Sequence, residues 1–339
     1  MFNQNNLGIF MAANQANQDF RELVPERILG AVESLGRPCN GSILALNSYE
    51  NRVYQVSLED DSILIAKFYR ANRWSDAAIR EEHAFTLALA AMELPVVAPL
   101  TIYDHTLHHY RSFRFALYPR RGGHWPELNN PDNLMCLGRF IARIHALGAV
   151  RNFIHRPTLD SDSYGVQSYR FLLDHDFIPH DLQLAYRTLV EDVLERSNVC
   201  FQRAGKLRYI RLHGDCHPGN ILWTDAGPHF VDFDDCRMGP AIQDLWMLLS
   251  GERDEMTGQL AKLLQGYSEF HDFDYRELHL IEALRSLRML HYSAWLAQRW
   301  SDPAFPLNFP WFNTHAYWEQ QILALREQLA LLEEAPLQV

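Results

Sequence analysis

Two short segments in the second half of the chain decide the fold: RLHGDCHPGNIL, residues 211–222, and HFVDFDD, residues 229–235. The first segment has a histidine two residues before Asp215 and carries Asn220 five residues after that aspartate. The second is an apolar run that predicts a short buried strand ending in Asp232. Carboxylate and amide oxygens are ligands that hard divalent cations prefer. The two segments together therefore indicate a metal-assisted reaction.

The order and spacing of these side chains match the catalytic loop of protein kinases. That loop has the pattern His-x-Asp-x-x-x-x-Asn, in which the aspartate accepts the proton of the attacking hydroxyl and the asparagine binds magnesium. Asp215 and Asn220 take those positions, and Asp232 takes the place of the Asp-Phe-Gly aspartate, although Asp234 replaces its glycine. The sequence therefore predicts phosphoryl transfer, with Asp215 and Asp232 as catalytic residues and Asn220 and Asp232 as metal ligands.

Other interpretations of the same residues fit less well. Cys216 and His217 are neighbours whose side chains diverge, and no second Cys or His pair lies at zinc-finger spacing. The run from Asp232 to Asp235 lacks the glycine and the final glutamate of a calcium loop. His213 is expected to hold the loop by hydrogen bonds, since a carboxylate suits the role of base better. Plain turn chemistry explains single Asp and Asn residues, but not the ordered set.

The composition is that of a globular protein. At 339 residues the chain is long enough for two lobes with separate cores. The formal net charge of -11 argues against nucleic acid as the main partner, whereas ATP needs only local neutralisation of its phosphates. The five cysteines are widely scattered, which suits reduced thiols. Because there is no basic leader and no run of eighteen apolar residues, we expect a cytoplasmic protein without membrane contact.

The sequence changes from β-rich to helix-rich near Pro119, and we place a lobe boundary there. Residues 1–20 are rich in Asn and Gln and are expected to form a flexible N-terminus. Residues 21–118 are predicted to be the ATP-binding lobe, and residues 119–339 the catalytic and substrate lobe. The predicted fold class is α+β, a bilobal protein-kinase-like fold. It has a small β-rich N-lobe with a helix and a large, mainly helical C-lobe.

Hydrophobic periodicity predicts the elements within each lobe. In the first lobe, helices are expected at residues 24–35 and 74–92, a hairpin at 53–56 and 62–69, and a further strand at 111–118. In the second lobe, helices are expected at residues 135–147, 182–200, 242–249, 259–267, 278–300 and 317–332.

Lys67 is a candidate for ATP binding in the first lobe. It lies in the middle of the strand Ile65-Ala66-Lys67-Phe68, which is close to the Val-Ala-Ile-Lys pattern whose lysine contacts the α- and β-phosphates. Such a lysine needs a carboxylate from the next helix to hold its rotamer. Glu82 shares a helix face with apolar residues and is the predicted partner, with Glu81 as the alternative.

The nucleotide loop departs from the usual glycine-rich pattern. Residues 46–54, LNSYENRVY, lie between the first predicted helix and the first predicted strand and contain no glycine. Backbone N–H groups of a polar turn still bind phosphate, and Ser48 is the candidate that adds a hydroxyl. Main-chain groups near Leu117 and Tyr118, at the predicted hinge, are expected to bind adenine.

Taken together, these residues resemble the aminoglycoside phosphotransferase-like kinases. That family includes choline and homoserine kinases and shares the eukaryotic protein-kinase fold. The similarity extends along almost the whole chain and is greatest to a bacterial Ser/Thr protein kinase of the family. It includes residues 46–55, 67–70, 153–158, 211–223, 239–249 and 302–306.

The resemblance implies ATP as phosphate donor and Mg²⁺ as cofactor, with Asp215 as the base, Asn220 and Asp232 as magnesium ligands and Ser48 as an ATP contact. It also implies a monomer that phosphorylates Ser and Thr hydroxyls of proteins in a stress response. The chain departs from protein kinases in having no evident activation loop between Asp232 and Asp244. Control by phosphorylation of such a loop is therefore in doubt.

Several other residues receive a weaker interpretation. Asp244, just after a Gly-Pro pair, is expected to brace the catalytic loop. The aromatic-rich segment 295–318 is either core or a wall of the acceptor site. Arg288 and Arg299 have no pattern that assigns them to substrate binding.

Three functions remain open from the sequence. The leading hypothesis is ATP-dependent phosphorylation of Ser and Thr in proteins. A kinase of the same fold acting on a small alcohol such as choline, homoserine or an aminoglycoside is the runner-up, and the acidic balance suits a cationic acceptor. A nucleotide-binding pseudokinase scaffold is the third. The joint presence of Lys67, Asp215, Asn220 and Asp232 counts against that scaffold, which has no need of the full set.

Overall fold

The structure is a computed structural model that describes residues 20–339, so the flexible N-terminus predicted for residues 1–20 lies, except for its last residue, outside the described residues. The chain divides into two compact units. Of the described residues, the N-unit comprises 20–124 and 222–234, and the C-unit comprises 125–221 and 235–339. The functional lobe boundary placed at Pro119 remains a prediction.

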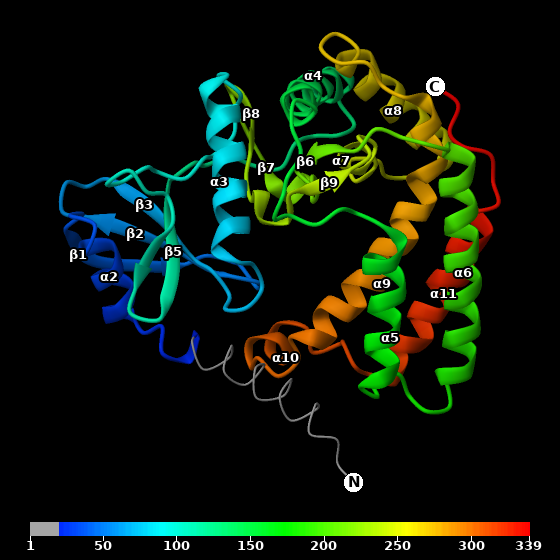
Figure 1. Ribbon diagram of the computed structural model, residues 1–339, viewed down its shortest axis with the longest axis horizontal. Coiled ribbons are helices and arrows are strands. Elements are labelled where there is room, and N and C mark those ends of the chain that lie inside the picture. The colour runs from blue at the N-terminus through cyan, green and yellow to red at the C-terminus, as the bar shows by residue number, and fades with distance from the viewer. Residues whose placement is uncertain (1–19) are drawn as a thin grey trace. The chain divides into compact units, whose positions relative to one another are not determined.

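The N-unit is built on a five-stranded antiparallel sheet (Figure 1). In pairing order its strands are β1 (Cys39–Ala45), β2 (Arg52–Leu58), β3 (Ile63–Phe68), β5 (Phe113–Pro119) and β4 (His108–Tyr110). The predicted hairpin is confirmed as β2 and β3, in which Val53 pairs with Lys67. The predicted strand at residues 111–118 is confirmed as β5.

The first strand corrects the placement of the nucleotide loop. The sequence predicts that loop between a helix and the first strand, whereas β1 precedes it and the loop joins two strands. β1 has a register shift between Cys39 and Ile43, and Gly41 has a φ of +90°. A bulge of this kind interrupts the alternation of apolar and polar residues, which is the pattern that predicts a strand.

Helices cover both faces of the N-unit sheet. α2 (Pro25–Glu33) buries Ile28 and Val32 in a core cluster that includes Phe68 and Phe115. α3 (Asp76–Ala91) packs Ile79 on the opposite face, in a cluster with Ala116. The Ser75 hydroxyl caps α3 by accepting the Ala78 N–H at 3.1 Å. The predicted helix at residues 74–92 is thereby confirmed.

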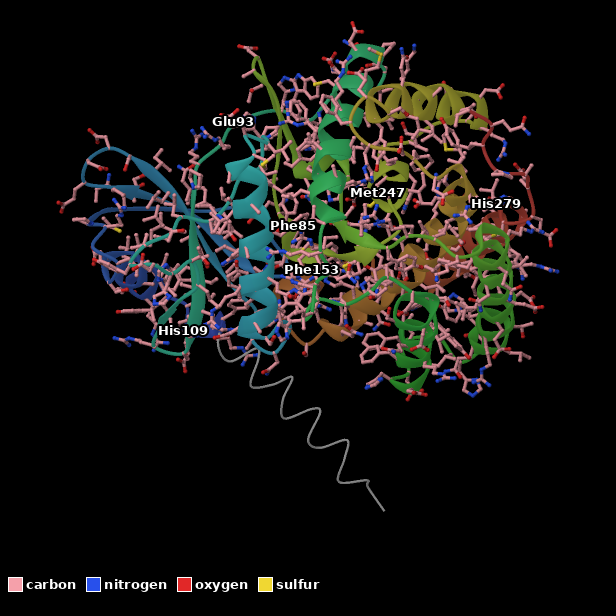
Figure 2. All side chains as sticks on the ribbon, turned by 45° about the horizontal axis from the view of Figure 1, so that its top comes forward. Phe85, Glu93, His109, Phe153, Met247 and His279 are labelled. Carbon is pink, nitrogen blue, oxygen red and sulfur yellow. The ribbon has the colours of Figure 1, made fainter. Side chains whose placement is uncertain are left out.

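The segment 222–234 belongs to the N-unit because its main chain bonds there. β7 (Ile221–Thr224) and β8 (Gly227–Phe230) form a two-stranded sheet. The Phe230 N–H donates to the Pro95 carbonyl at 2.7 Å, and the Phe230 carbonyl accepts from the Val97 N–H at 3.0 Å. Phe85 lies on α3 (Figure 2). Its ring meets that of Phe233 edge to face, with ring centroids 6.0 Å apart. These contacts place the end of β8, and hence Asp232, beside α3.

The C-unit is mainly helical. Its helices are α4 (Pro131–Gly148), α5 (Gln167–Asp174), α6 (Gln183–Ala204), α7 (Gln243–Trp246), α8 (Arg253–Tyr267), α9 (Ile281–Gln298), α10 (Ala304–Asn308) and α11 (His315–Leu331). β6 (Ile210–Leu212) pairs with β9 (Arg237–Gly239). The helices predicted at residues 135–147, 182–200, 259–267, 278–300 and 317–332 are confirmed, whereas the one predicted at 242–249 is only the short α7.

Close packing of α4 on α8 depends on two glycines. A Cβ on Gly138 would collide with the Leu263 carbonyl oxygen, and one on Gly266 would collide with that of Met135. The aromatic-rich segment 295–318 contributes to the core, since Phe305 and Trp318 have no exposed area. None of the helices in residues 20–339 combines the length and the apolar character needed to cross a membrane.

Candidate active site

Lys67 lies at the centre of a buried charged cluster in the N-unit. It pairs across the sheet with Ala116, so its side chain stands on the face that α3 covers. Its Nζ is 2.8 Å from Asp232 Oδ1 and 3.3 Å from Asp234 Oδ1. The ion pair with Asp232 joins residues 165 positions apart in the chain. Two predicted site residues, Lys67 and Asp232, are thus brought together.

The pKa of Lys67 reflects two opposing effects. Burial lowers it, but the negative charges of Asp232, Asp234 and Glu82 outweigh burial and hold the pKa well above its ordinary value. The lysine is therefore charged throughout the physiological pH range. A compact ammonium held in this way suits the oxygens of a phosphate.

Asp232 occupies a strained turn at the end of β8. Its φ of +59° lies in the left-handed region, which Asp tolerates better than bulky residues. The 3-10 turn Phe233–Asp235 follows directly. The side chain of Asp232 is 54% exposed although one oxygen is paired with Lys67. The carboxylate is therefore open to a further ligand, as a magnesium-binding residue must be.

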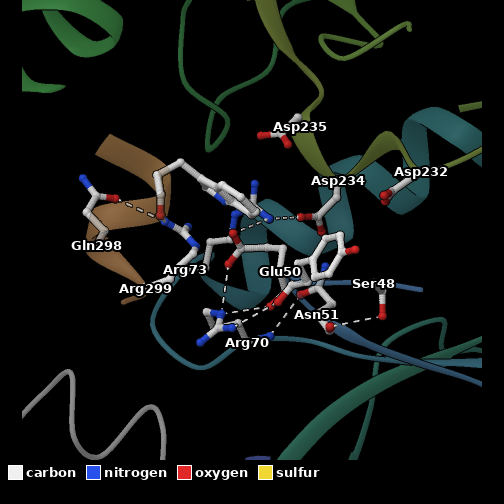
Figure 3. A network of polar contacts seen from close by, with 12 residues as sticks. Ser48, Glu50, Asn51, Arg70, Arg73, Asp232, Asp234, Asp235, Gln298 and Arg299 are labelled. Atoms are coloured by element: carbon white, nitrogen blue, oxygen red, sulfur yellow. Dashed lines mark hydrogen bonds and ion pairs between the residues drawn. The ribbon is translucent and has the colours of Figure 1, made fainter. Parts of the chain in front are cut away.

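Asp234 and Arg73 are functional candidates that the sequence analysis missed. Arg73 forms ion pairs with Asp234 and with Glu50, the latter at 3.4 Å (Figure 3). Glu50 also lies 3.1 Å from the Nε of Arg70, so charges alternate from Lys67 through to Arg70. Asp234 takes the position of the glycine in the Asp-Phe-Gly motif of protein kinases. This replacement is the sequence feature that could have marked Asp234 as a functional candidate. This cluster fixes Glu50, in the nucleotide loop, relative to Lys67.

Ser48 holds the nucleotide loop in shape. Its hydroxyl accepts the Val53 N–H at 3.1 Å and lies 3.3 Å from the Asn51 carbonyl (Figure 3). Asn51 in turn accepts the Arg70 N–H at 3.0 Å. Side-chain hydrogen bonds therefore stabilise this turn in place of glycines. That Ser48 also contacts ATP remains a prediction.

Glu82 lies on the buried face of α3 and is 2% exposed. Its charge contributes to the high pKa of Lys67, but less than the charges of Asp232 and Asp234. The shortest ion pairs of Lys67 are with those two aspartates. The pairing of Lys67 with Glu82, in preference to Glu81, therefore remains a prediction.

The predicted hinge residues lie on β5. The Leu117 carbonyl accepts the Leu100 N–H at 2.7 Å. The Tyr118 hydroxyl lies 2.9 Å from that of Tyr69 and 3.4 Å from His83 Nε2. Burial raises the pKa of Tyr118 above its ordinary value, so the phenol stays neutral. Adenine binding by the main chain here remains a prediction.

The C-unit brings Asp215 and Asn220 together in the loop after β6. Asn220 Nδ2 donates to the Asp215 carbonyl at 2.9 Å and lies 3.3 Å from Asp215 Oδ2. A carbonyl can only accept, so the amide nitrogen must face it. The amide oxygen of Asn220 is therefore directed away from Asp215 and is available to a metal.

Asp244 braces this loop, as predicted. Its carboxylate, 1% exposed, accepts the N–H groups of His213 and Gly214, each at 2.8 Å. His145 Nε2 lies 3.1 Å from it. Burial raises the pKa of Asp244, but the hydrogen bond and charge of His145, with the other donors, lower it overall. His213 Nδ1 also accepts the Asp215 N–H at 3.3 Å, which fits its predicted role of holding the loop.

Arg288 of α9 is a second residue that the sequence analysis left unassigned. Its Nη1 lies 2.7 Å from Asp215 Oδ1. The two residues are 73 positions apart and belong to no shared sequence motif, so only the folded structure reveals the pair. The guanidinium of Arg288 thus forms an ion pair with the predicted catalytic base.

Each of the two predicted metal ligands, taken by itself, has the chemistry that Mg²⁺ prefers. Asp232 offers an exposed carboxylate and Asn220 an amide oxygen without a hydrogen bond in residues 20–339, and both are oxygen ligands of the type that Mg²⁺ takes. Within that part of the chain, no group of three or more His, Cys, Asp or Glu side chains is arranged so that it could hold a metal ion. A site with few protein ligands suits Mg²⁺, which keeps several waters and binds substrate phosphates.

Comparison with known proteins assigns the chain to a family. Residues 42–281 match the model of the phosphotransferase enzyme family. The chain belongs to this family. Stress response kinase A of Escherichia coli O157:H7 is 42% identical over 326 residues, which cover 96% of this chain and 98% of that protein. Serine/threonine protein kinase RdoA of Salmonella typhimurium is 43% identical over 320 residues, with 94% and 97% covered.

Solved structures of other proteins share the fold. Amicoumacin kinase in complex with AMP-PNP and Ca²⁺ has a TM-score of 0.67 at 20% identity, with 89% of this chain and 91% of that chain covered. A microcompartment-associated aminopropanol kinase has the same TM-score at 18% identity, with 89% and 95% covered. The predicted α+β kinase-like fold, the predicted family and the predicted enzyme class, a kinase, are confirmed.

Proposed function

We propose that this phosphotransferase uses ATP and Mg²⁺ to phosphorylate Ser and Thr hydroxyls of proteins in a bacterial stress response. The observation that carries the proposal is the ion pair between Lys67, which is buried, and Asp232, which is half exposed, because it places a cation suited to phosphate beside a carboxylate suited to a metal. Relatives more than 40% identical along nearly the whole chain, called stress response kinase A and serine/threonine protein kinase RdoA, support the acceptor class.

In this proposal each predicted residue has one role. Lys67 binds α- and β-phosphate oxygens, with Glu82 as a further partner, and Asp232 and Asn220 hold the metal. When bound, Mg²⁺ neutralises charge on the phosphates. Asp215 takes the proton of the acceptor hydroxyl while the acceptor oxygen bonds to the γ-phosphorus and the bond from phosphorus to the leaving ADP oxygen breaks.

The remaining assignments complete the proposal. Ser48 contacts the nucleotide phosphates, and the main chain near Leu117 and Tyr118 binds adenine. Residues 21–118 act as the ATP-binding lobe and residues 119–339 as the catalytic lobe. The protein works as a cytoplasmic monomer.

The proposal is tested with purified protein, labelled ATP and Mg²⁺, supplied in parallel with generic protein acceptors and a panel of small alcohols. We expect label on Ser or Thr of protein, located by mass spectrometry, and none with the Asp215→Asn variant. Chelation of divalent cations should stop the transfer, and added Mg²⁺ should restore it. Label on a small alcohol alone would overturn the protein-kinase assignment.

A small-alcohol kinase is the second candidate. The net charge of -11 favours a cationic acceptor over an anionic one by long-range attraction. In the same assay, choline, homoserine and an aminoglycoside represent this class. Rapid turnover of one of them, with no labelled protein in a cytoplasmic extract, would assign the function to this candidate.

A further inference from the structure

The two oxygens of Asp215 are held differently. Oδ2 lies 3.3 Å from Asn220 Nδ2 and 3.5 Å from His217 Nε2. Oδ1 is buried and accepts no aligned hydrogen bond, although Arg288 Nη1 lies 2.7 Å away as an ion pair. A buried carboxylate oxygen without a hydrogen bond has unused capacity to accept one. Oδ1 is therefore the oxygen suited to the proton of an acceptor hydroxyl, and Arg288 stands in front of it.

Arg288 is able to leave that position. Its side chain is 35% exposed, against 21% for that of Asp215. Within residues 20–339 its guanidinium makes no second ion pair. An arginine anchored by one ion pair and no aligned hydrogen bond moves at small cost, provided that its charge finds another anion.

Aromatic and positively charged side chains lie near the ion pair between Arg288 and Asp215. Tyr164 lies in a π-helical turn, Asp162–Val166, and stacks on His291 with ring centroids 4.2 Å apart. π-Helical turns are frequent at functional sites. The guanidinium of Arg237 lies 4.8 Å from the Tyr164 ring centroid.

The pKa of His291 reflects the charged side chains around it. Burial, followed by the positive charges of Arg237, Arg299 and Arg288, lowers the pKa of His291 to about 3, and the charge of Asp235 only partly opposes this. The imidazole is therefore neutral, and of the charges that act on it, those of three arginines lower its pKa and that of Asp235 raises it. A cationic acceptor would be repelled here, whereas an anionic one would be attracted.

We propose that Arg288 is a specificity-determining residue that selects acceptors with an anionic group next to the hydroxyl. A carboxylate or phosphate of the acceptor pairs with the guanidinium, draws it from Asp215 and leaves Oδ1 free for the hydroxyl. A basic acceptor has to displace the same arginine without supplying a counter-ion. This inference rests on the proposed function and narrows it to acidic Ser/Thr segments.

The test compares matched Ser peptides whose neighbouring residues are Asp, Ala or Lys. We expect the wild-type protein to favour the Asp peptide over the Lys peptide by about tenfold or more in kcat/KM, which is the order of one charge contact at a binding site. Arg288→Gln should reduce that ratio to within about twofold, mainly by raising KM for the Asp peptide. Arg288→Lys keeps the charge and should keep part of the preference. Arg276→Gln, at an exposed arginine paired with Asp274, is the matched control and should keep all of it.

Two results would overturn the inference: equal kcat/KM for the three peptides in wild type, or an acid preference that survives Arg288→Gln. If the Gln variant does not fold, the inference is tested by the salt dependence of the wild-type preference for the Asp peptide. A preference based on charge weakens as the KCl concentration rises. A preference that salt leaves unchanged also overturns the inference.

The proposed function fails in a different way, because then no peptide of any charge is labelled while a small alcohol is. Arg288 in that case predicts a hydroxy acid over an amino alcohol in the same kcat/KM comparison. The reverse order would overturn the role of Arg288 by itself.

Discussion

The charged clusters around Lys67 and around Asp215 both pair a basic side chain with an aspartate, but they differ in burial. In the N-unit, the side chains of Lys67 and Asp234 are 8% and 4% exposed, and each has more than one ionic partner. In the C-unit, Asp215 and Arg288 are 21% and 35% exposed, and Arg288 has a single ionic partner among the described residues. We call the cluster around Lys67 the locked cluster, because its buried side chains share several ionic partners. We call the cluster around Asp215 the open cluster, because its one ion pair can exchange for another.

This difference matches what each group has to do. In the proposed function, Lys67 binds phosphate oxygens that do not take part in proton transfer, so a fixed position shared among several charges is sufficient. In the same proposal, Asp215 has to gain a proton and therefore needs an oxygen that an acceptor can reach. Its main chain is fixed instead, through the hydrogen bonds that Asp244 accepts from the preceding residues. The main chain of the loop is held by these hydrogen bonds, whereas the Asp215 side chain is partly exposed and its Oδ1 is covered by Arg288.

The largest effect is expected at the open cluster. Asp215→Asn keeps the shape of the side chain but removes the base, so phosphoryl transfer should fall by about two to four orders of magnitude. ATP binding, measured by calorimetry, should stay near the wild-type value, because Lys67 and Asp232 are unchanged. Near-normal turnover of the variant would remove Asp215 from the role of base.

Glu277, a buried glutamate next to the helix that carries Asp244, predicts that the free energy of unfolding depends on pH. Glu277 Oε2 accepts the Ile242 N–H at 2.8 Å, just before α7, which carries Asp244. Burial raises the pKa of Glu277 from 4.5 to about 7, so folding favours its protonated form. Its contribution to stability is full below about pH 4.5 and is lost as the pH rises to about 7, a change of about 3 kcal/mol.

The variant Glu277→Gln keeps the acceptor oxygen without the titration. Its free energy of unfolding, measured with urea at several pH values, should lack this loss between about pH 4.5 and 7. Glu59→Gln, at an exposed glutamate, is the control and should follow the wild-type curve. Parallel curves for Glu277→Gln and wild type would contradict the prediction.

An intermediate effect is expected for the two predicted metal ligands. Asp232→Ala removes a charged carboxylate, whereas Asn220→Ala removes one neutral oxygen, so the former should weaken magnesium-dependent ATP binding more, by about tenfold. Calorimetry with and without Mg²⁺ measures both. Affinities that are equal and independent of metal in the wild type and both variants would contradict the assignment.

How far the sequence predicted these clusters depends on the distance between partners along the chain. Asp215 and Asn220 lie in one loop, so their spacing alone predicted that they lie near one another, although not the hydrogen bond that joins them. Lys67 and Asp232 are far apart, but each belongs to a motif of known order. Arg288 has neither advantage. An arginine on a helix has no local pattern that indicates a partner 73 residues earlier.

The locked cluster shows a second limit of prediction from the sequence. The replacement of glycine by Asp234 was visible, but its ion pairs with Lys67 and Arg73 were not, because they depend on how β8 is attached to the N-unit. Likewise β1 was missed because its bulge at Gly41 disrupts the period of two. Where periodicity is regular, as in α3, the sequence predicted both the helix and its buried face.

The smallest effect is expected within the locked cluster, from Glu82. Lys67→Ala should abolish most activity, and adding Glu82→Ala should then cost less than about a further threefold, because a partner without its lysine has little left to do. The same comparison with Glu81→Ala tests the alternative partner. A fully additive loss would show that Glu82 acts independently of Lys67, and the aspartates at 2.8 and 3.3 Å from Nζ would then be sufficient to hold the lysine.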